Sequence, residues 1–191
     1  PAPYPRLREG FAAATGHFGE FLQGLLGPSG PVALVTLPCP MLAARAVWRA
    51  GGPFALCAGP DSPLSPRRAV ELLRKMRGGP GGRLRIGWDM PAGGGAGAST
   101  AALVAAARAV AAGAGDPPPT PETLASLCRA VEGACDPLML PAPAAALWAS
   151  RQGRALAALP PPPVFEVVGG FHGPPLRTNP ADTDFADIAD L

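Results

Sequence analysis

The sequence of 191 residues contains very little lysine and histidine. Lys75 is the only lysine, and His17 and His172 are the only histidines. Two scattered histidines are too few for a histidine-based metal site, and Lys75 does not stand in the Gly-Lys-Ser/Thr context that a Walker A loop requires. The net charge is only +2, and no basic stripe is interleaved with aromatic residues. We therefore expect no binding to nucleic acid.

Long apolar runs and paired cysteines are also lacking. No run of 18 apolar residues occurs, which predicts no transmembrane helix, and residues 11–26 lack the apolar core of a signal peptide. Cys39, Cys57, Cys128 and Cys135 show no Cys-x-x-Cys spacing. We expect free, buried thiols in a reducing cytoplasm rather than a disulfide framework or a zinc site. Because only 6% of residues are aromatic, alanine and small aliphatic residues must fill the core.

Glycine, by contrast, is concentrated in the segment Pro91-Ala-Gly-Gly-Gly-Ala-Gly-Ala-Ser-Thr-Ala101. It lies between an expected strand over residues 83–88 and an alanine-rich helix over residues 99–112. Glycines let a backbone approach a ligand closely, and a helix start offers unpaired N–H groups and a positive dipole end. The alternative is a surface turn whose Ser99 only caps the helix. The favoured prediction is a phosphate-binding loop formed by Pro91, Gly93, Gly94, Gly95, Ala96, Gly97, Ala98, Ser99 and Thr100.

A dinucleotide-binding loop is the second interpretation of the same segment. Gly93, Gly95 and Ala98 match Gly-x-Gly-x-x-Ala, and Asp116 follows after about 20 residues. However, Asp116 lies in Gly-Asp-Pro-Pro-Pro, which is typical of a loop, and the motif does not follow a first strand. An oxidoreductase is therefore the weaker alternative.

The pattern Pro-x-Gly-x-Gly-x-Gly-x-Ser99-x-Ala resembles the phosphate-binding motif of the GHMP small-molecule kinases. Two further segments, Gly16–Gly24 (GHFGEFLQG) and Asp136–Pro141 (DPLMLP), resemble motifs of the L-threonine kinase branch, which serves cobalamin side-chain synthesis. The resemblance runs from about Thr15 to about Phe185. It implies an α+β fold of the GHMP kinase N-terminal domain type, in which helices cover one face of a mixed β-sheet.

This resemblance also implies an activity. The expected reaction is phosphoryl transfer from ATP to the hydroxyl of a small molecule, here L-threonine, with Mg²⁺ as the second cofactor. Asp136 is the predicted catalytic base. Its expected place at a helix C-terminus is electrostatically unfavourable, which is more typical of a functional residue than of a structural one. A solvated turn aspartate before Pro137 is the alternative.

Metal and substrate ligands are expected near Asp136. Ser99 and Glu132 are the predicted Mg²⁺ ligands, with Glu132 one turn before Asp136 on the same expected helix face. Within the kinase branch we expect the glutamate one position later, where Gly133 stands, so a solvated helix charge is the alternative for Glu132. The predicted substrate-binding residues are Gly16, His17, Glu20 and Gln23, although His17 also fits a half-buried structural role.

The remaining patterns predict how the chain is organised. We expect a ragged segment over residues 1–14, an ATP-binding domain over 15–181, and the start of a missing C-terminal domain over 182–191. Thr183 resembles a helix N-cap, and Phe185, Ile188 and Leu191 would then share one helix face. A C-terminal domain or a homodimer partner would cover that face, and the fragment alone would be inactive. A truncated, non-catalytic nucleotide-binding domain is the alternative.

The secondary structure expected elsewhere follows from apolar periodicity and from turn residues. A strand over residues 32–37 and its partner over 43–48 come first. Further strands are expected over 83–88, 148–156 and 164–168, and helices over 66–76, over 99–112, and from Thr120 to near Asp136.

Overall fold

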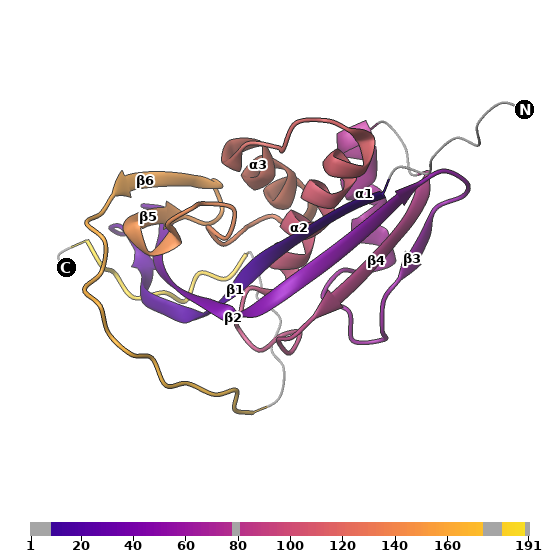
Figure 1. Ribbon diagram of the computed structural model, residues 1–191. Helices are drawn as coiled ribbons and strands as arrows, with labels where there is room; N and C mark the ends of the chain where they lie inside the picture. The colour runs from indigo at the N-terminus through magenta and orange to yellow at the C-terminus, as the bar shows by residue number, and fades with distance from the viewer. Residues whose placement is uncertain (1–8, 78–80, 174–180, 190–191) are drawn as a thin grey trace, which may run out of the picture.

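Two long strands, β1 (Glu9–Leu25) and β2 (Val32–Ala50), pair antiparallel, and β2 is the central strand of the sheet. The computed structural model describes residues 9–77, 81–173 and 181–189. In that part of the chain, a six-stranded mixed sheet is combined with three α-helices and one short 3-10 helix (Figure 1). The other elements are β3 (Ala55–Cys57), α1 (Pro66–Arg77), β4 (Gly82–Trp88), α2 (Ala98–Ala114), α3 (Pro121–Glu132), η1 (Pro143–Ala145), β5 (Ala146–Ala149) and β6 (Arg154–Ala158).

The order of the strands shows why the sheet is mixed. Along one edge, β2 pairs with β1 over almost its full length. Along the other edge, the C-terminal half of β2 pairs antiparallel with β4, and its N-terminal end pairs antiparallel with β5. Strand β3 then adds to β4 in parallel, and β6 adds to β5 antiparallel. The expected α+β fold with a mixed sheet is confirmed.

The central pair of strands is bent where its register shifts. Thr15 pairs with Ala43, but the next residue, Gly16, pairs with Cys39, and two more shifts follow before Leu22. Such bulges interrupt the ladder and bend a strand pair locally. The bend places His17 and Glu20 between the β4 half and the β5 half of β2.

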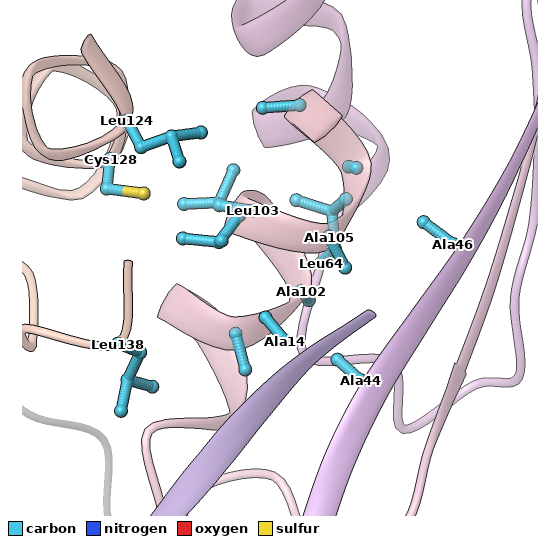
Figure 2. Close-up of a cluster of buried hydrophobic side chains, with 14 of the residues drawn as sticks. Ala14, Ala44, Ala46, Leu64, Ala102, Leu103, Ala105, Leu124, Cys128 and Leu138 are labelled. Atoms are coloured by element: carbon cyan, nitrogen blue, oxygen red, sulfur yellow. The ribbon is translucent and has the colours of Figure 1, made fainter. Parts of the chain in front are cut away.

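The three helices cover one face of the sheet, with α2 lying against the central strands (Figure 1). Figure 2 shows Ala14, Ala44 and Ala46 of β1 and β2 facing this helix, while Leu103 lies toward α3. Almost every side chain of α2 is buried, as the alanine-rich sequence predicts. Small residues also permit close contact, since a Cβ atom added to Gly10 would lie 2.0 Å from the Ala109 carbonyl oxygen.

One predicted strand pairing is wrong, and one strand was missed. Segments 32–37 and 43–48 are both in strand conformation, but they are parts of the single strand β2 rather than partners, and β1 was not expected. Pro38 and Pro40 suggest a break in the sequence pattern, but they fall at the bend, where a bulged ladder tolerates proline. The bulges of β1 also shift the alternation of its side chains, which hides the period of two.

The C-terminal third departs further from the predictions. The expected strand 148–156 is the β5–β6 hairpin, and residues 164–168 are exposed and outside any strand. The helix expected to begin at Thr183 is absent from the described residues 181–189. Instead, the N–H of Ile188 donates to the Leu25 carbonyl (2.8 Å), and the Ile188 side chain is buried. Leu191 lies outside the described residues, and the boundary between 181 and 182 stays a prediction.

Helix α3 ends earlier than expected. It stops at Glu132, and Gly133 caps it in the left-handed conformation, with its N–H bonded to the Arg129 carbonyl. Asp136 therefore lies in the loop after the helix, so the expected helix-terminal position of its carboxylate is wrong, as is the shared helix face with Glu132. The N-terminus of α3 is as predicted, because the Thr120 hydroxyl accepts the Thr123 N–H and Pro121 is the first helical residue. Of the helices described, none has both the length and the apolar composition needed to cross a bilayer.

Candidate active site

The glycine-rich segment forms the connection from β4 to α2. Gly93, Gly95 and Gly97 have φ angles of 78°, 70° and 66°, in the left-handed region that favours glycine. Gly97 is the N-cap of α2 and has no side chain to cap the helix, so the first-turn N–H groups are left for another acceptor. Ser99 is the second residue of the helix. The alternative in which Ser99 caps α2 is therefore wrong.

Strand β1 holds this loop closely. The backbone N–H of His17 donates to the Ala96 carbonyl at 3.1 Å. A Cβ atom on Gly16 would lie 2.6 Å from that same oxygen and 2.7 Å from the sulfur of Met90. Only glycine fits at position 16 without a shift of the loop. The structure thus gives Gly16 a contact with the loop, while its predicted contact with substrate stays a prediction.

Ser99 meets Glu132 and Arg68 on one side of the helix start. The Ser99 hydroxyl and the Glu132 carboxylate are hydrogen-bonded. Arg68 of α1 approaches with Nη1 at 2.8 Å from Glu132 Oε1 and 3.2 Å from Ser99 Oγ. We call Arg68, Ser99 and Glu132 the Arg68 cluster. Burial raises the pKa of Glu132, and the Asp136 charge adds to this, whereas the Ser99 hydrogen bond and Arg68 oppose it without cancelling it.

His17 meets Glu20 and Asp136 in a second group, which we call the His17 cluster. His17 Nε2 lies 3.5 Å from Asp136 Oδ2, and His17 Nδ1 lies 3.6 Å from Glu20 Oε1. The imidazole is buried, while the Asp136 side chain is 27% exposed and so remains accessible to a ligand. The backbone of Asp136 is held in turn, because its N–H donates to the Thr100 hydroxyl at 3.4 Å.

The carboxyl group of Glu20 is in an unusual setting. Burial raises the pKa of Glu20 to about 7, although the nearby His17 charge and Thr36 hydroxyl oppose the shift. Thr36 is the partner of Glu20 across the β1–β2 ladder. Even so, Glu20 Oε2 and Thr36 Oγ1 are both buried without a hydrogen-bond partner in the described part of the protein. A neutral, protonated Glu20 fits this setting better than a carboxylate.

The two clusters differ in what they could bind. Ser99 and Glu132 offer a hydroxyl and a carboxylate, the hard oxygen ligands that suit Mg²⁺. In the His17 cluster, one atom from each residue lies within 4.8 Å of the others. There, however, Nδ1 already accepts the Gly19 N–H at 2.9 Å, and Nε2 faces Asp136. Both ring nitrogens therefore already have partners within the protein, which makes this cluster the weaker candidate for Mg²⁺.

The predicted site residues thus separate into two groups, and the fold adds one residue that was not predicted. The loop residues and Ser99, Thr100, Glu132, Asp136, Gly16, His17 and Glu20 are all brought to the start of α2. Gln23 is not, since it is exposed farther along β1 and pairs with Leu34. Arg68 was not predicted, because nothing in α1 distinguishes it from Arg67 or Arg74 before the fold is known.

The sequence of this site region matches a known protein family. Residues 65–140 match the GHMP kinases N terminal domain. That segment carries α1, the glycine-rich loop, α2, α3 and Asp136. No curated protein matches the chain.

Solved structures similar to the chain include three small-molecule kinases. One is mevalonate kinase from methicillin-resistant Staphylococcus aureus (18% identity, TM-score 0.45, covering 65% of this chain and 44% of that one). The second is a putative sugar kinase from Campylobacter jejuni (16% identity, TM-score 0.49, covering 67% of this chain and 46% of that one). The third is homoserine kinase from Cytophaga hutchinsonii (17% identity, TM-score 0.43, covering 68% of this chain and 43% of that one). The chain spans less than half the length of these structures.

Proposed function

We propose that this chain is the ATP-binding part of a GHMP-type small-molecule kinase. The observation that carries the proposal is the uncapped start of α2, with the Arg68 cluster on Ser99 and with Asp136 bonded to Thr100. The match of residues 65–140 to the GHMP kinases N terminal domain supports it. The reaction would transfer the terminal phosphoryl group of ATP to the hydroxyl of a small molecule.

The phosphate side of the reaction falls to the glycine-rich loop and the Arg68 cluster. Backbone N–H groups at the start of α2 bind phosphate oxygens, aided by the positive end of the helix dipole. Ser99 and Glu132 would hold Mg²⁺, which, when bound, neutralises phosphate charge. Because the site has no lysine, Arg68 is the side chain placed to add positive charge on this side.

The acceptor side of the reaction falls to Asp136. Its partly exposed carboxylate accepts the proton of the substrate hydroxyl as that oxygen bonds to the terminal phosphorus atom. The bond between this phosphorus and the bridging oxygen breaks, and ADP leaves with the bonding electrons. The hydrogen bond to Thr100 keeps the Asp136 backbone against the start of α2, so the base stays at a fixed position relative to the phosphate site.

L-Threonine is the substrate we propose. The segments Gly16–Gly24 and Asp136–Pro141 support it through their resemblance to the L-threonine kinase branch, and a role in cobalamin side-chain synthesis in the cytoplasm would follow. Because the chain spans less than half of the matched structures, we further propose that a C-terminal domain or a second copy completes the substrate pocket.

A coupled ADP-release assay on the full-length protein tests the proposal. Threonine, homoserine, serine and mevalonate are compared at saturating Mg-ATP, and threonine should give the highest kcat/KM. ATP binding without turnover on any of the four would favour the non-catalytic nucleotide-binding domain. Enhanced NADH fluorescence on addition of the protein would favour the dinucleotide-binding alternative.

A further inference from the structure

His17 is a buried imidazole with a carboxyl group at each ring nitrogen. Its side chain is only 6% exposed, with Asp136 at Nε2 and Glu20 at Nδ1. These two groups come from different parts of the fold, since Glu20 lies on β1 and Asp136 in the loop after α3. Among the ion pairs of the described residues, Asp136 takes part in one, and its partner is His17.

The imidazole ring is fixed in place by its surroundings. Its backbone N–H is bonded to Ala96, and the Gly19 N–H donates to Nδ1 at 2.9 Å. The ring also lies directly against Gly97, where a Cβ atom would approach His17 Cδ2 to 2.5 Å. With Nδ1 accepting a hydrogen bond, the proton of the neutral ring is on Nε2, which faces Asp136 Oδ2.

We propose that His17 is the positioning residue for Asp136, which its Nε2–H holds by one carboxylate oxygen so that the other oxygen faces the substrate hydroxyl. This inference rests on the proposed role of Asp136 as base. A carboxylate on a loop has rotational freedom, and one fixed oxygen removes it. Catalysis by a correctly held base is lost steeply when the base is displaced.

The charge of His17 should strengthen this hold. Burial lowers the pKa of His17, but the hydrogen bond to Asp136 and the charge of Asp136 outweigh it, so the pKa lies above its ordinary value of 6.5. The positive end of the α2 dipole and the Gly19 N–H oppose protonation, and β2 presents only the uncharged Thr36 and Pro38.

A nuclear magnetic resonance titration tests the contact without any enzyme assay. The chain has only two histidines, and His172 is exposed and serves as an internal reference. We expect the Hε1 signal of His17 to titrate above the ordinary histidine value of 6.5. Asp136→Asn should then lower the His17 midpoint. An unchanged His17 midpoint in Asp136→Asn would overturn the proposal.

Steady-state kinetics of the full-length kinase give the second test. Glutamine places an amide N–H near the position of Nε2, so His17→Gln keeps a donor but loses the titratable charge. We expect His17→Met to lower kcat about tenfold or more with the KM for ATP unchanged. In the wild-type protein, kcat should fall as the pH rises and His17 loses its charge. His17→Gln should recover part of the loss seen in His17→Met, and its kcat should depend less on pH. A purely structural His17 would not give a flattened pH profile.

The outcomes separate the two proposals. If the wild-type protein turns over none of the substrates, the proposed function fails, and the titration still decides whether His17 and Asp136 are coupled. If the wild-type protein is active and a folded His17→Met variant has the same kcat, the positioning role fails while the kinase assignment stands. Should His17→Met not fold, His17→Gln supplies the pH profile.

Discussion

The Arg68 cluster and the His17 cluster are built alike but differ in the nature of their cation. Each places a buried carboxyl group beside one basic side chain, and each contacts the first residues of α2. Ser99 serves the Arg68 cluster, whereas the next residue, Thr100, binds the Asp136 backbone. Successive residues of a helix point about 100° apart, so neighbouring hydroxyls serve two different groups.

This difference in cation divides the two proposed tasks. A guanidinium is a permanent cation in proteins, as a phosphate and metal site requires. An imidazole can gain or lose a proton, and the pKa of His17 is raised above its ordinary value, so the proposed base that it contacts is sensitive to pH. One helix start can therefore organise a permanently charged nucleotide side and a titratable acceptor side.

The largest effect should come from removing the proposed base, Asp136. Asp136→Asn in the full-length protein should lower kcat by roughly 10² or more, the usual scale for a lost general base, while ATP affinity is kept. Glu122→Gln is a matched control, because Glu122 is an exposed carboxylate in the first turn of α3. Normal turnover by Asp136→Asn would show that the base lies elsewhere.

Removing the carboxylate of the Arg68 cluster should affect metal use instead. Glu132→Gln should raise the Mg²⁺ concentration for half-maximal ATP turnover about tenfold or more, the scale at which even supporting residues of metal sites act. Glu71→Gln is the control, because the Glu71 side chain on α1 is 39% exposed and pairs with Lys75 instead of Arg68. A titration of turnover against free Mg²⁺ measures the effect. An unchanged Mg²⁺ requirement would assign Glu132 to a structural ion pair with Arg68.

A third change acts on the loop that both clusters share. Gly95→Val should lower ATP affinity about tenfold, or about 1.4 kcal/mol, because a β-branched residue is strained at a φ of 70° and obstructs the phosphate approach. Gly87→Val on β4 is the control, since a Cβ atom there meets nothing within 4 Å and its φ is not in the left-handed region. Calorimetry with Mg-ATP measures both. Equal affinity in a folded Gly95→Val protein would remove the loop from nucleotide binding.

The sequence predicts those parts of the fold and site whose signals are local. A pattern within a few residues is enough to predict the glycine-rich loop, the alanine-rich α2 and the Thr120-Pro121 cap of α3. The single strand β2 could not be predicted, because Pro38 resembles a break until the bulged pairing with β1 is known. Nor could β1, whose bulges disrupt the alternation.

The clusters required the fold for the same reason. His17 and Asp136 are far apart in the sequence, and only the bend in β1 and the early end of α3 bring them within 3.5 Å. Glu132 was expected to lie on the same helix face as Asp136, but the end of α3 separates them, and Glu132 turns to Ser99 instead. No sequence pattern near Arg68 predicts its role, since that role depends on how α1 packs beside α2.

The smallest expected effect concerns stability, and it separates the titratable cluster from the permanent one. The pKa of Glu20 is about 7 in the folded protein against an ordinary 4.5. Between these pH values the folded state keeps a proton that the unfolded state has released, so stability falls as pH rises and levels off above about pH 7. His17 contributes with the same sign, because its pKa is also raised.

Glu20→Gln should therefore flatten the dependence of stability on pH. From pH 6 to pH 8, loss of the Glu20 titration should remove about 1 kcal/mol of the decline in the free energy of unfolding. Glu132 also has a raised pKa and keeps its own contribution, so the decline should be reduced rather than abolished. Urea unfolding of both proteins at the two pH values measures this. Identical slopes would mean that Glu20 is ionised across the whole range and that its burial does not control its charge.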